Sequence, residues 1–254
     1  MTIRENPPVG APIWIDLMTS DRDKSVGFYS ALFGWTADEP NAAFGGYTNL
    51  RLDDETVAGL MDTQEPSMPD VWSVYLSVAD AAATVAKAKD AGAQVMVEPM
   101  AVGDLGVMAV IIDPGGAVIG MWQAGEHRGG VVATTGAPCH FELHTRDYDT
   151  VVPFYRDVFG WTITPQADTP GFRYALYELG DGQGAGIMDA AAMLPEGAPS
   201  CWAVYFATDD VEKTLALAET LGGTTVLAAE RTPYGVLAEG LDATGARYKL
   251  RGDN

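Results

Sequence analysis

An internal duplication is the feature that most constrains this chain. The stretch Pro12 to Trp35, PIWIDLMTSDRDKSVGFYSALFGW, is matched by the stretch Pro138 to Trp161, PCHFELHTRDYDTVVPFYRDVFGW. Because several landmarks share a single offset, the sequence predicts two similar domains in tandem. The landmarks, all at an offset of 126 residues, are Asp21 with Asp147, Phe28-Tyr29 with Phe154-Tyr155, and Phe33-Gly34-Trp35 with Phe159-Gly160-Trp161.

Length and composition agree with two globular domains. The chain has 254 residues, of which 47% are hydrophobic and 20% are charged, and this suits two domains of about 100–150 residues each. We predict a first domain over residues 1–127 and a second over residues 133–254, with the boundary between Ala124 and Ala137.

The charge balance narrows the expected partners. A formal charge of −20, from 35 acidic and 15 basic residues, disfavours binding to nucleic acid or to an anionic membrane surface. The two cysteines, Cys139 and Cys201, form neither a metal-binding spacing nor a small disulfide framework. We therefore expect a small-molecule ligand as partner, with no nucleic acid and no membrane, and a chain that is a monomer or a homodimer.

The sequence also predicts a cytoplasmic location. The sequence contains no run of roughly 18 apolar residues, which is the length that a helix needs to span a bilayer. The opening residues MTIRENPPVGAP lack the basic region and the apolar core of a signal peptide.

A strand, an aspartate and a helix follow one another four times along the chain. Each unit is expected to be βαβββ, with its helix covering one face of a curled mixed sheet and the other face left free. Two such units per domain would form a cup, and the fold class would be α+β. The four aspartates are Asp21, Asp80, Asp147 and Asp210. The strands that the apolar patterns indicate lie at 13–18, 45–51, 55–61, 72–78, 105–112, 117–123, 140–145, 173–179, 184–188, 202–208, 235–240 and 246–250.

These features resemble the vicinal oxygen chelate superfamily, which contains glyoxalase, bleomycin-resistance and extradiol dioxygenase proteins. The resemblance rests on strand-x-Asp-helix with Phe-Tyr and Phe-Gly-Trp, on Ala-Gly-Leu-Met at 58–61 and Ala-Gly-Ile-Met at 185–188, and on Asp-Pro-Gly-Gly at 113–116. It covers about residues 12–250. The tandem layout looks most like the actinobacterial two-domain group that includes the mycobacterial 27-kDa antigen and glyoxalase-like proteins of antibiotic clusters.

In the metal-dependent members, the resemblance implies one ligand on the first strand of a domain, one on the fifth and a glutamate on the eighth. Here these positions hold Trp14, Ser73 and Gly120 in the first domain, and His140, Ala203 and Lys249 in the second. Only His140 could bind a divalent ion, whereas a catalytic site needs about three nitrogen or carboxylate ligands. The ammonium of Lys249 would repel a cation. We therefore predict no metal and no cofactor.

The second cup carries the most suggestive polar residues. The alternation of CHFELHT places His140, Glu142 and His144 on one strand face. One interpretation is a structural network in which Glu142 pairs with Lys249. Another is an acid/base site, since a histidine beside a carboxylate can move a proton near neutral pH. A metal held by one neighbouring pair and an outside ligand is a third.

In the first cup, Asp16 is the only ionisable group that the strand pattern places on the floor. If buried, it would have a raised pKa and could act as a base; it could equally face an arginine such as Arg51. Aromatic and thioether side chains suit flat apolar ligands, although a strand slipped by one residue would reverse every facing. Trp35, Trp161, Phe28 and Phe154 are assigned to the core. The candidate binding residues are Trp14, Met18, Tyr47, Met61, Tyr75 and Trp122 in the first cup and Tyr174, Met188 and Tyr205 in the second.

Three functions remain open from the sequence. The first is a metal-independent enzyme, a lyase or isomerase, that acts on a planar or carbonyl-containing small molecule such as a secondary metabolite; its candidate catalytic residues are His140, Glu142, His144, Lys249 and Asp16. The second is a protein that binds and sequesters a drug or metabolite. The third is a metal-dependent lyase or dioxygenase. All three depend in part on an analogy of fold, which is weak support for function.

Overall fold

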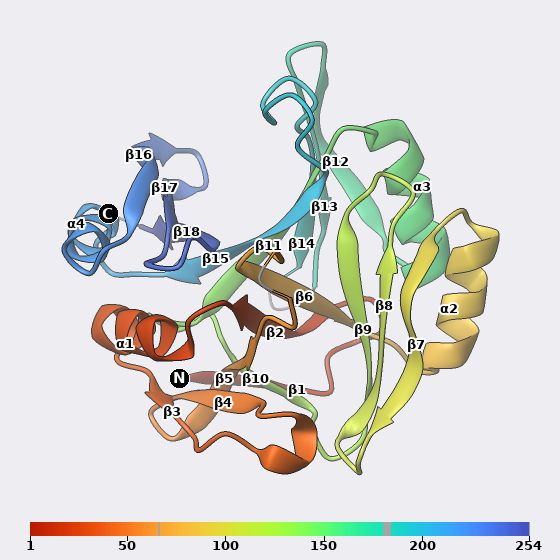
Figure 1. The fold of residues 1–254 in the computed structure, drawn as a ribbon. Coiled ribbons are helices and arrows are strands. Elements are labelled where there is room, and N and C mark those ends of the chain that lie inside the picture. Colours follow the sequence, from red (N-terminus) through yellow and green to blue (C-terminus); the bar gives the residue numbers. More distant parts are fainter. Residues whose placement is uncertain (66, 180–183, 254) are drawn as a thin grey trace.

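A computed structural model describes residues 1–65, 67–179 and 184–253. Four βαβββ units follow one another along the chain (Figure 1). The first unit comprises β2 (Pro12–Thr19), α1 (Arg22–Phe33), β3 (Thr36–Ala37), β4 (Thr48–Leu52) and β5 (Glu55–Asp62). The second comprises β6 (Val71–Ser77), α2 (Ala81–Asp90), β7 (Gln94–Val102), β8 (Gly106–Ile112) and β9 (Val118–Ala124).

The same order of elements recurs in the second half of the chain. The third unit comprises β11 (Pro138–Thr145), α3 (Tyr148–Phe159), β12 (Ile163–Thr169), β13 (Phe172–Tyr177) and β14 (Ala185–Asp189). The fourth comprises β15 (Cys201–Ala207), α4 (Val211–Thr220), β16 (Thr224–Thr232), β17 (Gly235–Leu241) and β18 (Arg247–Gly252). A short 3-10 helix, η1 (Ala42–Phe44), precedes β4.

Local sequence signals explain where the helices begin and end. The carboxylates of Asp21, Asp80 and Asp210 each accept a hydrogen bond from the backbone N–H three residues later, which satisfies a free donor of the first helical turn. The fourth aspartate, Asp147, precedes α3 without such a bond. Helix α1 ends at Gly34, whose φ of 76° is left-handed and favours glycine.

The two halves form separate eight-stranded mixed sheets with equivalent strand orders. The first runs β3-β4-β5-β2-β6-β9-β8-β7, and the second runs β12-β13-β14-β11-β15-β18-β17-β16. In each sheet the first strands of the two units, β2 with β6 and β11 with β15, pair antiparallel at the centre. The fold is therefore α+β with two curved sheets, as the duplication predicts.

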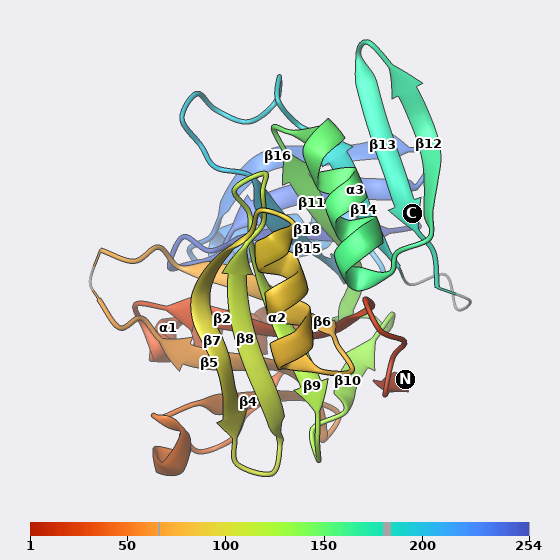
Figure 2. The same cartoon turned by 90° about the vertical axis from the view of Figure 1, so that its right-hand side faces the viewer.

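The helices lie where the two halves meet. Helix α2 contacts α3 (Figure 2), and α1 contacts α4 (Figure 1). Phe28, Trp35, Phe154 and Trp161 are all buried in one apolar core that both halves share, which confirms their assignment to the core. The indole of Trp35 donates to the carbonyl of Gly136, 2.8 Å away in the other half. Burial of these aromatic faces holds the two sheets together.

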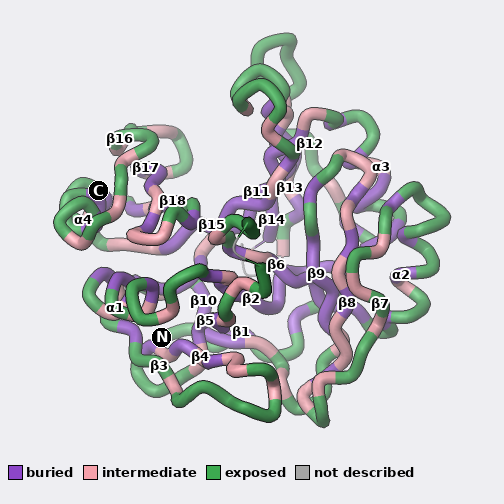
Figure 3. Tube along the Cα trace, viewed as in Figure 1, coloured by how far each residue is buried: buried purple, intermediate pink, exposed green. Residues whose placement is uncertain are grey.

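Four strands of the two large sheets lie outside the ranges read from the sequence. These are β3, β7, β12 and β16, each at an edge of its sheet. Their residues are half-buried or exposed (Figure 3), and Pro99 in β7 and Pro165 in β12 interrupt the usual strand composition. Proline is tolerated at an edge because a ladder hydrogen bond there is dispensable. The apolar alternation that marks central strands is therefore weak in these four.

A small additional sheet joins the beginning of the chain to the segment between the halves. It pairs β1 (Thr2–Glu5) antiparallel with β10 (Gly129–Val132). No helix in the described part of the chain is long and apolar enough to cross a bilayer.

Candidate ligand-binding site

A cavity of about 880 Å³ lies on the face of the first sheet opposite its core. This face, with the loops around it, is called the first cup. Such a volume is in the range of small-molecule sites. Its lining is largely apolar and includes, besides the central strands, residues of η1 and of the β7–β8 hairpin. The lining residues are Trp14, Asp16, Asn41, Ala43, Phe44, Gly45, Tyr47, Asn49, Thr56, Met61, Tyr75, Val97, Met100, Ala101, Val102, Gly103, Leu105, Met108, Trp122 and His127.

Glycine helps to shape the cup floor. A Cβ at Gly120 on β9 would collide with the ring of Tyr75, and a Cβ at Gly59 on β5 would collide with Tyr47. The two rings therefore lie flat over the sheet only because glycine is beneath them. Gly59 belongs to the Ala-Gly-Leu-Met motif, and its counterpart Gly186 lies in the same way beneath Tyr174. The glycine of this motif is therefore needed because any larger residue would collide with the tyrosine ring above it.

Asp16 is a buried carboxyl group in this cavity. Burial raises its pKa to about 6, against hydrogen bonds with Tyr75 and Ser73 that lower it. Burial and the Asp16 charge together raise the pKa of Tyr75 well above its usual value, so Tyr75 stays protonated and donates to Asp16. The alternative partner, Arg51, instead binds Asp38 through Nε–Oδ1 at 2.7 Å. A carboxyl group with such a pKa exchanges protons near neutral pH.

Two further interactions order the aromatic floor. The indole N–H of Trp14 donates to the Tyr47 hydroxyl at 2.8 Å. The ring of His127 lies edge-on to Trp14, with 4.2 Å between the centroids, and Trp122 donates to the backbone carbonyl of His127 at 2.9 Å. Burial lowers the pKa of His127 to about 4, so its imidazole is neutral at pH 7.

His127, Phe44 and the methionines Met100 and Met108 were not predicted as site residues. They come from η1, from the β7–β8 hairpin and from the segment after β9. Their sequence neighbourhoods carry no motif, and only the fold brings them to one cavity. The chain has only three histidines, and this scarcity was the one signal that could have drawn attention to His127. It does not indicate which cup His127 would reach.

The corresponding face of the second sheet, called the second cup, holds a connected polar network. The Glu142 Oε1 atom lies 2.6 Å from Nε2 of His144 and accepts from the Tyr205 hydroxyl at 2.9 Å. His140 Nε2 lies 3.0 Å from the Tyr174 hydroxyl and 3.8 Å from Glu142 Oε2. Phe141 and Leu143 face the core instead, so the strand has the facing that its alternation predicts.

Lys249 has a different ion-pair partner from the one expected. Its Nζ lies 3.3 Å from Oε2 of Glu239 on the neighbouring strand β17, and Glu239 also contacts Arg247. The Lys249 ammonium donates to the Tyr205 hydroxyl at 3.2 Å, so Lys249 and Glu142 are linked through Tyr205. The alternation of β18 could place Lys249 in the cup, but Glu239 enters through strand pairing that the sequence does not reveal.

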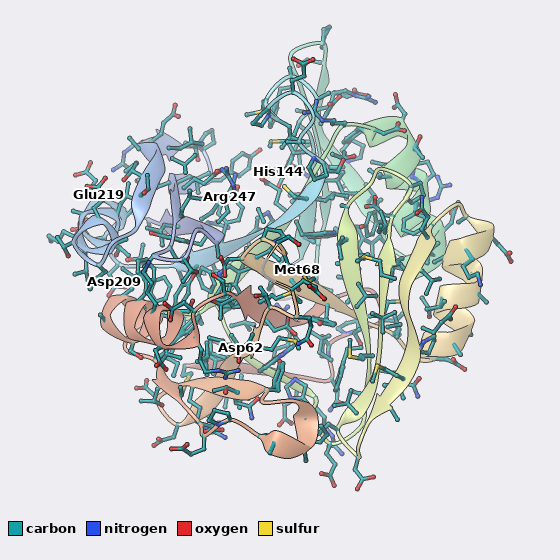
Figure 4. All side chains as sticks on the ribbon, in the orientation of Figure 1. Asp62, Met68, His144, Asp209, Glu219 and Arg247 are labelled. Carbon is teal, nitrogen blue, oxygen red and sulfur yellow. The ribbon has the colours of Figure 1, made fainter. Side chains whose placement is uncertain are left out.

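Charge and burial shift the pKa values of the ionisable groups in this network. Burial raises the pKa of Glu142, but the nearby imidazoles and the Lys249 charge outweigh this and hold it well below its usual value. Burial lowers the pKa of His144. His144, from β11, and Arg247, from β18, are labelled in Figure 4. Glu142 is therefore ionised, and the largely buried side chains of the network already satisfy one another.

Equivalent positions explain why the cups differ. Trp14 and Tyr47 of the first cup correspond to His140 and Tyr174 of the second, and Asp16 and Tyr75 correspond to Glu142 and Tyr205. Both cups thus pair an acid with a tyrosine on the floor. The first has Gly120 and Met18 where the second has Lys249 and His144. At this position of the first cup the Tyr75 ring covers Gly120, whereas in the second cup the Lys249 ammonium binds Glu239 and the Tyr205 hydroxyl.

The structure therefore brings the predicted binding residues Trp14, Tyr47, Met61, Tyr75 and Trp122 together around one cavity with Asp16. Met18, half-buried near the end of β2, lies outside that lining. Tyr174 and Met188 pack in a small apolar cluster with Ala190, and Tyr205 belongs to the polar network.

The residues at the family's metal positions do not fit a metal. In the first cup the eighth-strand position, Gly120, is covered by the Tyr75 ring. In the second cup the same position is Lys249, whose ammonium is bound to Glu239. Across the described residues, no three His, Cys, Asp or Glu side chains converge as metal ligands would.

Two tandem βαβββ pairs, each with a curved sheet and a cup on its free face, define a glyoxalase-like protein of two domains. The chain belongs to the Glyoxalase/Bleomycin resistance protein/Dioxygenase superfamily, which matches residues 12–121 and 138–247.

Similar proteins match almost the whole length of the chain. The chain is 36% identical over 248 residues to "Putative glyoxylase CFP32" of Mycobacterium tuberculosis, covering 95% of this chain and 94% of the relative. It is 35% identical over 264 residues to "Anthracycline biosynthesis protein DauV" of Streptomyces sp. (strain C5), covering 95% and 92%. Among solved structures, the Mn(II)-bound glyoxalase from Novosphingobium aromaticivorans matches with a TM-score of 0.68 at 15% identity, covering 97% of this chain and 83% of that one. At this identity the likeness concerns the fold alone.

Proposed function

We propose that the first cup binds a planar, carbonyl-containing small molecule and that Asp16 moves a proton on it. The observation that carries this proposal is the presence of one buried carboxyl group, with a pKa of about 6, inside an aromatic cavity of about 880 Å³. A buried carboxyl group of raised pKa beside an apolar binding surface is a frequent arrangement in proton-transfer enzymes. The anthracycline biosynthesis relative supports a secondary metabolite as the ligand.

In the proposed reaction, the Asp16 carboxylate removes a proton from a carbon next to the ligand's carbonyl group. The C–H bonding pair becomes the carbon–carbon double bond of an enolate, and the carbonyl electron pair moves to oxygen. Where that carbon also bears a carbon–carbon double bond, the enolate is a dienolate. Asp16 then returns the proton to the far carbon of the dienolate, the carbonyl group re-forms, and the remaining double bond lies next to it, which gives the conjugated isomer. Tyr75 and Ser73 hold the carboxyl group in place, and burial, which raises the pKa of Tyr47 well above its usual value, keeps its hydroxyl proton available to the enolate oxygen. No step uses a metal or a cofactor.

The second cup has a structural role in this proposal. Glu142, His144, Lys249 and Glu239 are each less than a tenth exposed and bind one another or Tyr205. Such a satisfied network stabilises a fold and leaves few free groups for a ligand.

The test is proton exchange on an enolisable planar ketone. We would follow deuterium uptake into 2-tetralone in D2O by NMR, with wild-type protein, Asp16→Asn and, as the matched control in the second cup, Glu142→Gln. Wild type should accelerate exchange over buffer, Asp16→Asn should lose about a hundredfold of that acceleration, and Glu142→Gln should retain it. Equal exchange in wild type and Asp16→Asn would remove Asp16 from the mechanism.

A second candidate function is sequestration of a drug or metabolite. The thioether side chains of Met61, Met100 and Met108 in the cavity lining favour this alternative, because methionine adapts its shape to varied ligands. Binding of planar probes in the first cup with no proton exchange on any of them would select sequestration over catalysis.

A further inference from the structure

The charge of the first cup is one-sided. Asp16 is a carboxyl group, and the lining of the cavity contains no lysine or arginine among the described residues. The one histidine of the lining, His127, is neutral at pH 7 because burial lowers its pKa to about 4. A ligand that enters this cup therefore meets a negative group without any compensating positive one.

Aromatic rings surround the same carboxyl group. Trp14, Tyr47, Tyr75 and Trp122 all line the cavity with Asp16. The faces of aromatic rings carry negative electrostatic potential and attract cations, and tryptophan is the strongest of them. A carboxylate within a group of four aromatic side chains is a recognised arrangement for binding an ammonium or another organic cation.

The charge of the whole chain acts in the same direction. A formal net charge of −20 raises the local concentration of small cations and lowers that of anions. Asp104, next in the chain to the lining residues Gly103 and Leu105, and Glu126, next to the lining residue His127, are both exposed. They lie side by side, since the Glu126 backbone N–H donates to the Asp104 carbonyl. These two carboxylates add negative charge beside the cavity to that of its floor.

We infer that the natural ligand of the first cup is a planar molecule that carries a positive charge, with Asp16 as its counter-ion and the four rings as its cage. This inference rests on the proposed function and narrows its substrate class to organic cations. A bound cation would also favour the ionised form of Asp16, which is the form that the proposed proton transfer needs.

The test compares probes that share one ring system and differ in charge. At pH 8, 9-aminoacridine is a cation and acridine is neutral, while anthracene-9-carboxylate supplies an anion of similar shape. Equilibrium dialysis against the full chain measures the three dissociation constants. We expect 9-aminoacridine to bind at least about tenfold more tightly than acridine, as for a partly desolvated ion pair, and anthracene-9-carboxylate to bind more weakly than either.

Variants separate this inference from the proposed function. In Asp16→Asn the preference for 9-aminoacridine over acridine should fall to within about threefold. Glu142→Gln, in the second cup, should keep the full preference. If acridine binds as tightly as 9-aminoacridine in the wild-type protein, the charge inference is wrong and a planar neutral ligand remains. If no probe binds, or if Trp14→Ala leaves all binding unchanged, both the inference and the first-cup function fail.

Discussion

The hydroxyl group of Tyr29, on α1 in the first half, donates a hydrogen bond to Oδ2 of Asp242 in the second half, at 3.0 Å. The reverse contact also exists, since Tyr155 on α3 donates to Oδ2 of Asp113 at 2.8 Å. Each tyrosine hydroxyl also accepts from a buried indole, Trp72 at 2.9 Å and Trp202 at 3.2 Å respectively. The duplicated halves thus hold each other through two equivalent buried polar contacts.

Removal of either tyrosine hydroxyl should destabilise the whole chain. Tyr29→Phe and Tyr155→Phe each leave a buried carboxylate oxygen and an indole N–H without their partner, which costs about 1–3 kcal/mol. Urea unfolding followed by tryptophan fluorescence would measure this, and the exposed Tyr234 offers Tyr234→Phe as a neutral control. A loss for one tyrosine and none for the other would show that the two contacts are not equivalent.

Asp16→Asn should change how stability depends on pH. The folded pKa of Asp16 is about 6, against an ordinary value of 3.8, so the folded state holds this proton more tightly than the unfolded state. Its contribution is therefore fully present below pH 4 and is lost as pH rises through 6, for a difference of about 3 kcal/mol. Relative to wild type, Asp16→Asn should gain stability at pH 8 compared with pH 4. Parallel stability–pH curves for the two proteins would contradict the raised pKa.

Lys249→Met should be strongly destabilising, because it leaves Glu239 buried without one of its two cationic partners. Loss of one member of a buried ion pair costs about 3 kcal/mol. The double variant Lys249→Met with Glu239→Gln should recover much of that loss, since no unbalanced charge then remains. Lys213→Met, at an exposed site, serves as the control for removal of a lysine. Calorimetric unfolding of the wild type and the three variants would decide, and Lys249→Met as stable as the wild type would refute the pairing.

Gly120→Ala should damage the first cup. The added Cβ would strike the Tyr75 ring, which is tied to Asp16, so we expect a loss of about 1–3 kcal/mol and weaker ligand binding. Gly27→Ala is the matched control, because Gly27 lies in α1 with nothing near its added Cβ and should gain about 0.5–1 kcal/mol from helix propensity. Thermal unfolding measures both, and equal shifts in the same direction would contradict the steric role of Gly120.

Much of the architecture was predictable because it depends on local repeats. The four aspartates before the helices, the glycine that ends α1 and the alternation of residues 13–18 and 140–145 each act within a few residues of chain. The strand facing of Asp16 and Glu142 followed from the same alternation. Edge strands such as β7 escaped prediction because their exposed residues carry little apolar pattern.

The sequence by itself determined the duplication, the superfamily and the chemical types available on each cup floor. Only the tertiary structure showed that the first cup holds a cavity and which side chains meet on each floor. That outcome depends on strand neighbours far apart in the chain: the pairing of β6 with β9 places Gly120 beside Tyr75, and the pairing of β17 with β18 places Glu239 beside Lys249. Which side chains meet on a cup floor is set by such neighbours across the sheet, and no periodicity within one strand records them.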